Sequence, residues 1–106
     1  MPLKDFHETF DDELTDRVFA VGYLEVALEE NGLQGFLAAL RNIVRANGGV
    51  AKIAESAGLG RESLYKALSK DGNPQLSTVA SVLNALGLQV GVKLVPERES
   101  KEPQAA

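Results

Sequence analysis

The sequence predicts an all-α protein, a five-helix domain that contains a helix-turn-helix and ends in one short β-strand. Apolar residues recur at helical spacing in five stretches and alternate at strand spacing only after Gly87. The length of 106 residues suits one domain with one hydrophobic core. We therefore divide the chain into a flexible acidic arm over 1–13, a helix-turn-helix domain with its C-terminal strand over 14–95, and a disordered tail over 96–106.

The first two predicted helices are separated by Asn31-Gly32 and followed by Gly48-Gly49, and both pairs are typical of helix ends. The apolar residues of the first helix lie three or four positions apart. They are Leu14, Val18, Val21, Leu24 and Leu28. The second helix has its apolar stripe at Phe36, Leu37, Leu40, Ile43 and Val44. This spacing gives each helix one face for a shared core.

Three short helices are predicted next, over 50–57, 61–69 and 76–86. The first two have the residue types that a helix-turn-helix needs, because its helices cross closely through a tight turn. Ala54 is small where the helices meet, Gly58 accepts the positive φ of the turn, and Leu64 fills the angle between them. A helical hairpin that only packs is the alternative interpretation of this segment.

The predicted strand alternates between apolar and polar residues and ends before Pro96. Its apolar members are Leu88, Val90, Val92 and Leu94, and the residues between them are Gln89, Gly91 and Lys93. A single strand leaves its backbone hydrogen bonds unmade, so it needs a partner. The candidates are a second copy of the chain, the edge of another protein, and the N-terminal arm. The alternative is an extended tail that packs against the helices.

The second helix of the predicted helix-turn-helix is the one that enters the major groove in this motif. Its candidate DNA-binding residues are Arg61, Glu62, Ser63, Tyr65, Lys66 and Ser69. Arg61 has the donors to bind guanine, and Glu62 can accept from cytosine. Candidates for contacts to the DNA backbone are Ser63, Lys52, Lys70 and Asn73. Glu62 also suits a helix N-terminus, Tyr65 also suits packing at the domain edge, and the cations also suit a solvated face.

The net charge of −4 is distributed unevenly along the chain. Residues 1–30 hold nine acids and two bases, whereas residues 41–74 hold six bases and three acids. The middle of the chain therefore suits a phosphate backbone, and the N-terminal part suits a basic partner. The candidates for that partner are Asp11, Asp12, Glu13, Asp16, Glu25, Glu29 and Glu30. An ordinary solvated acidic face is the alternative for these seven residues.

Composition argues against catalysis, metal binding and a membrane location. The chain has no cysteine and one histidine, His7, which has no metal-ligand or catalytic spacing around it. We expect no enzyme activity, no metal and no cofactor. The first residues are acidic and lack an apolar core, and no apolar run is long enough to span a bilayer. We therefore expect a cytoplasmic protein with no membrane partner.

The residues from Tyr23 to Val92 resemble the HigA-like addiction module antidote proteins, antitoxins of type II toxin–antitoxin systems in the repressor-type helix-turn-helix class. The most specific part is GLGRESLYKALS, followed by DGNP and a helix that ends NALG. The resemblance implies a repressor-like fold and a small basic toxin partner of the RelE/HigB-like fold. It also implies repression of the protein's own operon, with the antitoxin usually a homodimer on double-stranded operator DNA. The reading helix of the family corresponds to Arg61–Ser69 here.

Two other functions remain open at this point. A stand-alone helix-turn-helix repressor would bind DNA without any toxin. A pure interaction module would keep the fold but would have lost DNA binding. In a salt titration with DNA, it would not show the steep fall in affinity that phosphate contacts cause.

Overall fold

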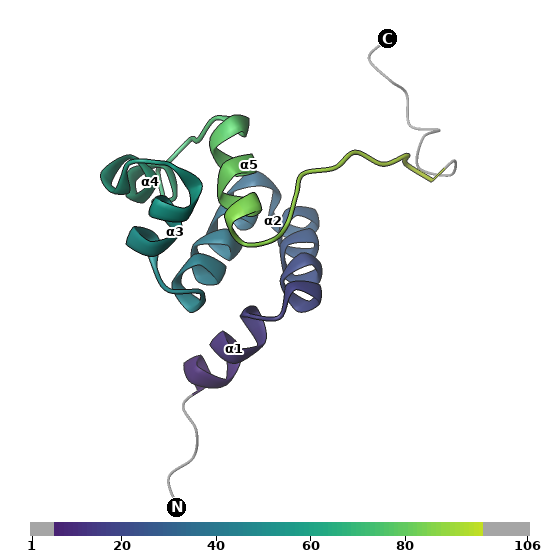
Figure 1. Cartoon of the computed structure of the whole chain (residues 1–106). Helices are drawn as coiled ribbons and strands as arrows, with labels where there is room; N and C mark the ends of the chain where they lie inside the picture. The colour runs from purple at the N-terminus through teal and green to yellow at the C-terminus, as the bar shows by residue number, and fades with distance from the viewer. Residues whose placement is uncertain (1–5, 97–106) are drawn as a thin grey trace, which may run out of the picture.

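The computed structural model of the chain describes residues 6–96, and all of its regular elements are helices. Figure 1 shows the helices gathered into one body, with the C-terminal segment leaving it on one side. The helices are α1 (Phe6–Leu14), α2 (Arg17–Ala46), α3 (Val50–Ala57), α4 (Arg61–Ala67) and α5 (Leu76–Ala85). The predicted all-α class is therefore confirmed. Within residues 6–96 no helix is both long and apolar enough to cross a bilayer.

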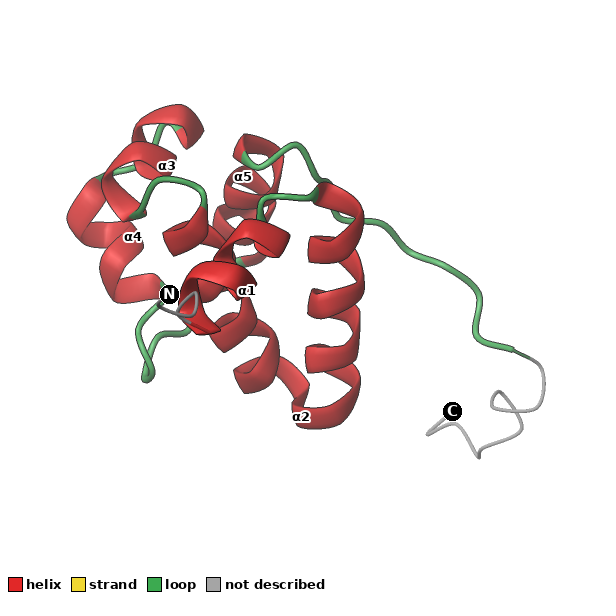
Figure 2. Ribbon diagram, turned by 90° about the horizontal axis from the view of Figure 1, so that it is seen from below, coloured by secondary structure: helices red, strands yellow, loops and turns green. Residues whose placement is uncertain are grey.

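Helix α2 consists of two helical halves that meet at a bend. Gly32 interrupts it with a φ of 66° and a ψ of −155°, a backbone conformation that glycine tolerates and other residues rarely adopt. The halves, 17–31 and 33–46, run in different directions (Figures 1 and 2). The helix end predicted at Asn31-Gly32 is confirmed by this bend. The second half of α2 carries Leu40, Ile43 and Val44 into the core that it shares with α3 and α5.

The hydrophobic core joins both halves of α2 to α3, α4, α5 and the end of α1. Its members are apolar, and the described residues include no buried polar or charged side chain. The largest fully buried side chains are Leu14, Leu37, Leu40, Ile43, Leu64, Val44 and Val82. Burial of this kind contributes about 1.5–3 kcal/mol for each large aliphatic side chain.

Residues 6–14 form α1, a helix that was not predicted within the flexible arm expected over 1–13. Leu14 is 1% exposed, and the ring of Phe10 lies edge-on to Tyr23 at 5.2 Å and to Phe19 at 6.1 Å. Phe10 and Leu14 are one helical turn apart, so one face of the short helix can pack on α2. The acidic residues between them hid this spacing in the sequence. Residues 1–5 lie outside the described part.

Polar contacts also hold α1 against the end of α2. The Asn47 amide donates to the carbonyl oxygens of Leu14 at 3.3 Å and of Ile43 at 2.8 Å. Arg45 Nη2 lies 2.7 Å from Asp11 Oδ1. Asp16 caps the start of α2, because its carboxylate accepts from the backbone N–H of Val18. These contacts fix the junction between the end of α1 and the start of α2.

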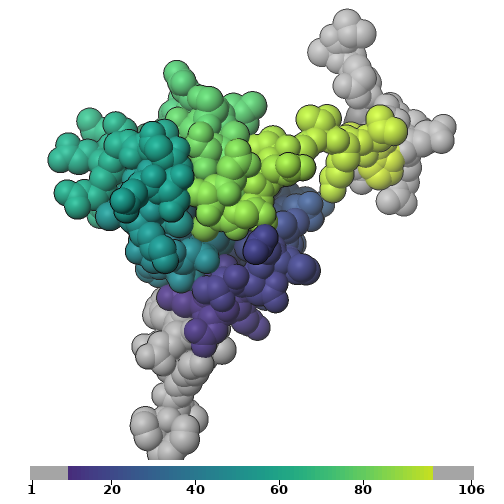
Figure 3. All heavy atoms as spheres, viewed as in Figure 1, coloured from purple at the N-terminus to yellow at the C-terminus, as the bar shows by residue number. Residues whose placement is uncertain are grey.

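The predicted C-terminal strand has no ladder partner among the described residues, and residues 88–96 are assigned no regular structure. Leu88 is half-buried and donates its N–H to the Leu83 carbonyl at 2.8 Å, but Val92 and Leu94 are 99% and 95% exposed. Figure 3 shows this segment projecting beyond the helices. A strand is defined by pairing, and a single chain offers this segment no second strand. The tail beyond Pro96 lies outside the described residues.

Candidate nucleic-acid interface

Helices α3 and α4 are joined by the three residues 58–60, and Gly58 shapes the turn. Gly58 has a φ of 72° and a ψ of 30°, in the left-handed region. The Leu59 N–H donates back to the Ala54 carbonyl at 2.9 Å, so the end of α3 is closed by backbone bonds. The positive φ that the sequence predicts at Gly58 is confirmed. The turn is short enough to hold α4 at a defined angle to α3.

The contact between the two helices is made by small and aliphatic side chains. Ala54 is 1% exposed on α3, and Leu64 is 1% exposed on α4. Ile53 and Leu68 are also buried, at 3% and 2%. A larger residue at position 54 would push the helices apart, because interiors are packed without spare volume. The Ala54, Gly58 and Leu64 positions therefore have the local roles that their spacing predicts.

The outer face of α4 is exposed along its length. Its exposed residues are Arg61, Glu62, Ser63, Tyr65 and Lys66. Tyr65 is 69% exposed, which favours an exposed role over packing at the domain edge. Arg61 is the first residue of the helix, and Glu62 lies in its first turn. The structure thus brings five of the nine predicted residues onto one exposed helix.

The other four predicted residues flank α4 in different ways. Lys52 is exposed on α3, and Lys70 and Asn73 are exposed in the loop that follows α4. Ser69 differs, since it is half-buried and its hydroxyl donates to the Lys66 carbonyl at 2.7 Å. Its hydroxyl hydrogen is therefore committed to the end of α4. Lys52, Lys70 and Asn73 remain on the surface beside the helix.

Arg41 positions α4, and the sequence analysis missed this role. Its Nη1 atom donates to the Leu68 carbonyl, the cap residue of α4, at 2.6 Å. A cation at a helix C-terminus satisfies an open carbonyl and complements the helix dipole. No sequence signal marks this contact, because the two residues are 27 positions apart. The bond ties α4 to the second half of α2.

The cations of the basic middle segment divide into two groups. Arg41 is bonded to Leu68, and Arg45 is bonded to Asp11 and to Asn42 at 2.9 Å. The remaining four form no ion pair with another described residue, and all are exposed. They are Lys52, Arg61, Lys66 and Lys70. The charge available to a phosphate backbone therefore lies on α3, α4 and the loop after α4.

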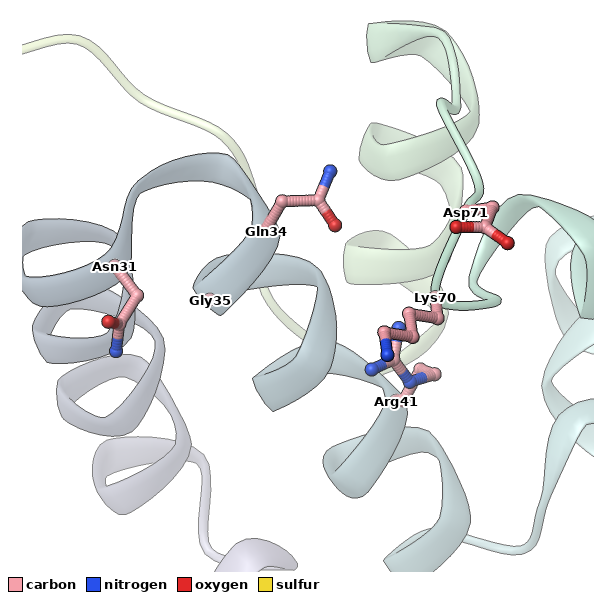
Figure 4. A pocket seen from close by; sticks show the side chains of 6 residues that line it. All are labelled: Asn31, Gln34, Gly35, Arg41, Lys70 and Asp71. Carbon is pink, nitrogen blue, oxygen red and sulfur yellow. The ribbon is translucent and has the colours of Figure 1, made fainter.

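A polar hollow lies between the bend of α2 and the loop after α4. Figure 4 shows the side chains that line one side of it, Arg41 from α2 and Lys70 and Asp71 from the loop after α4. Asn31, Gln34 and Gly35 line its other side. Lys70 is the exposed cation of this hollow, whereas the Nη1 atom of the half-buried Arg41 donates to the Leu68 carbonyl.

One family model and one relative match this chain over most of its length. The family model described as probable addiction module antidote protein matches residues 4–94. An uncharacterized protein of Haemophilus influenzae is 43% identical over 91 residues, which cover 86% of this chain and 91% of that protein. No solved structure matches the chain. Because the family model covers the five helices and the turn between α3 and α4, this chain belongs to the family of probable addiction module antidote proteins.

Proposed function

We propose that this chain is a DNA-binding, HigA-like antitoxin of a type II toxin–antitoxin system. In this proposal α3 and α4 form a helix-turn-helix, and the protein acts as a homodimer that represses its own operon. It also neutralises a small basic toxin of the RelE/HigB-like fold. The antidote family supports the antitoxin role. The exposed face of α4 is the observation that carries the DNA-binding role.

The length and chemistry of α4 suit the major groove. Its seven residues span about 10 Å, and the groove is about 12 Å wide. Arg61 lies at the helix end that reaches bases in helix-turn-helix proteins. Lys66 and Lys52 suit the phosphates on either side. Two copies would place their α4 helices in successive major grooves, about 34 Å apart, on a palindromic operator.

Exposed acidic residues at the end of α1 and near the bend of α2 support a basic toxin partner. Glu29 and Glu30 are exposed near the bend, and Glu13 is exposed at the end of α1. Asp11 and Asp16 are less available, because they bind Arg45 and the start of α2. Complementary charge raises the rate of association and excludes wrong partners. The toxin contact is therefore proposed for Glu13, Glu29 and Glu30 rather than for all seven acidic candidates.

The DNA-binding proposal is tested with Arg61→Ala and a matched control. We expect Arg61→Ala to weaken binding to the operator by about 1–3 kcal/mol, or about 5- to 150-fold, because a bidentate contact to guanine is lost. Arg17→Ala removes the same charge from the exposed start of α2 and should leave affinity unchanged. Fluorescence anisotropy with a labelled promoter duplex measures both. Equal losses of operator affinity in the two variants would show that Arg61 makes no specific contact with the DNA.

The antitoxin proposal is tested with the small open reading frame beside this gene. Expressed alone, the neighbour should stop growth. Co-expression with this chain should restore growth, and the two proteins should purify together. A harmless neighbour that does not bind would leave a stand-alone helix-turn-helix repressor, which is the alternative that the exposed α4 face also supports.

A further inference from the structure

The segment after α5 has a near-palindromic order of residue types centred on Gly91. Residues 88–94 read LQVGVKL, so leucines stand at both ends and valines flank the glycine. Between them lie Gln89 on one side and Lys93 on the other. A strand that adds to an unrelated protein has no reason for this symmetry. A strand that pairs with its own copy in antiparallel orientation does, because each residue then meets its mirror position.

We propose that residues 88–94 form the dimer interface, as an antiparallel two-stranded ribbon with a two-fold axis at Gly91. The proposal rests on the dimer in the proposed function and on none of its DNA or toxin contacts. The occupant of this exposed segment is a second copy of the chain. Apart from the Leu88 N–H, which donates to the Leu83 carbonyl, the segment offers such a copy its backbone, since it has no ladder partner in residues 6–96.

The Gly91 register pairs like with like. It sets Val90 opposite Val92 of the second copy, and Leu88 opposite Leu94 of the second copy. All four lie on one face of the ribbon, because side chains alternate along a strand. On the other face Lys93 meets Gln89 of the second copy, so no two like charges stand opposite each other.

A two-fold axis allows the pairing register to change only in steps of two residues. The two neighbouring registers pair the strands less well. A two-fold antiparallel pair keeps each residue on its own face, so one-residue slips are excluded. An axis at Val92 sets Leu88 opposite Pro96, which has no N–H to donate. An axis at Val90 sets Leu94 opposite Leu86, which is the cap residue of α5. Of the three, only the Gly91 axis pairs residues 88–94 entirely with one another and uses neither Pro96 nor the cap residue of α5.

The apolar side chains of the segment become more exposed with distance from α5, and a second copy would cover them. Leu88 is half-buried against the core, Val90 is 44% exposed, and Leu94 is 95% exposed. The ribbon would bring Leu94 of each copy beside Leu88 of the other, at the edge of the core. An isolated two-stranded ribbon is marginal in water, so this continuity with the core matters. Lys93 Nζ lies 3.8 Å from Glu25 Oε2, and both side chains are largely exposed, so this weak pair leaves the segment free for a second copy.

Cross-linking tests the register directly, because the chain has no cysteine. Gly91→Cys adds a side chain where a Cβ meets nothing within 4 Å. Opposite Cα atoms in an antiparallel pair are about 4.5–5.5 Å apart, which suits a disulfide. We expect most Gly91→Cys protein to form covalent dimers under mild oxidation, measured by non-reducing electrophoresis.

The matched controls use the same face of the ribbon. Gln89→Cys should stay monomeric on the gel, because two copies of position 89 lie about 13 Å apart in this register. The double variant Gln89→Cys with Lys93→Cys should cross-link, because those positions meet. Equal cross-linking of Gly91→Cys and Gln89→Cys, or none in either Gly91→Cys or the double variant, would overturn the proposal.

A second measurement separates the interface from the DNA-binding role. Val92→Glu changes a side chain that is 99% exposed, so the helical body should fold normally while sedimentation shifts from dimer towards monomer. Leu76→Glu, at a residue that is 68% exposed on α5, should remain dimeric. A dimeric Val92→Glu protein would reject the strand interface even if operator binding persisted. A protein that cross-links at Gly91 and ignores the operator would reject the DNA-binding role alone.

Discussion

At one end of the described chain a polar segment is packed against the core, whereas at the other end an apolar segment is exposed. Helix α1 is polar and acidic, and yet its last residue, Leu14, is 1% exposed. The segment 88–95 is rich in valine and leucine, and yet Val92 and Leu94 are 99% and 95% exposed. Apolar content by itself therefore predicts neither end. What decides burial is whether a complementary surface lies within reach.

The difference follows from the neighbours of each end. Helix α1 has an aromatic surface to pack on, since the rings of Phe19 and Tyr23 stack 6.4 Å apart on α2. It also has polar anchors at Arg45 and Asn47. Beyond Leu88 the C-terminal segment has passed the last helix, and the exposed fraction rises from 44% at Val90 to 99% at Val92. An apolar segment left open in this way is a surface for a partner.

Replacement of one leucine by alanine at each end should give the largest difference in the free energy of unfolding. Leu14→Ala should lower the free energy of unfolding by about 2–5 kcal/mol, because it leaves a cavity where α1 meets the core. Leu94→Ala should change it by less than about 0.5 kcal/mol at concentrations where the chain is monomeric. Urea denaturation of both variants measures the contrast. Similar losses at the two positions would show that the segment around Leu94 folds onto its own helices.

Removal of the cap between α1 and α2 should have an intermediate effect. Asp16→Ala should cost about 0.5–2 kcal/mol, because the N–H groups of Val18 and Phe19 lose their acceptor at the start of α2. Glu13→Ala removes the same charge from a nearby exposed position and should cost less. Thermal unfolding followed by circular dichroism compares the two. Equal costs would mean that charge, rather than the cap, stabilises this junction.

The ion pairs at the two ends should give the smallest difference. Asp11→Asn should cost about 0.2–1 kcal/mol, because it weakens a 2.7 Å pair with a half-exposed arginine, and salt should reduce the loss. Lys93→Gln should have no measurable effect, since its pair with Glu25 is 3.8 Å long and largely exposed. Denaturation at low and high salt separates the two. A larger loss for Lys93→Gln would show that the C-terminal segment is held to α2.

The predictions from sequence succeeded where structure depends on neighbours in the chain. The predicted helices over 50–57, 61–69 and 76–86 match α3, α4 and α5 to within two residues. The helix break at Gly32 and the left-handed turn at Gly58 were both predicted, because glycine is the residue that such backbone favours. The exposed face of α4 followed from helical spacing in the same way.

The amino-acid sequence by itself determined the all-α class, the bounds of the short helices, and which residues of α4 point away from the core. The tertiary structure decided the packing of α1, the bond from Arg41 to Leu68, the Asp11–Arg45 pair, and which cations stay exposed. The physical reason is distance along the chain. Helical periodicity and turn geometry act over a few residues, whereas these bonds join residues 27 and 34 positions apart. Such contacts depend on how whole helices are placed, and that placement is set by packing of the common core.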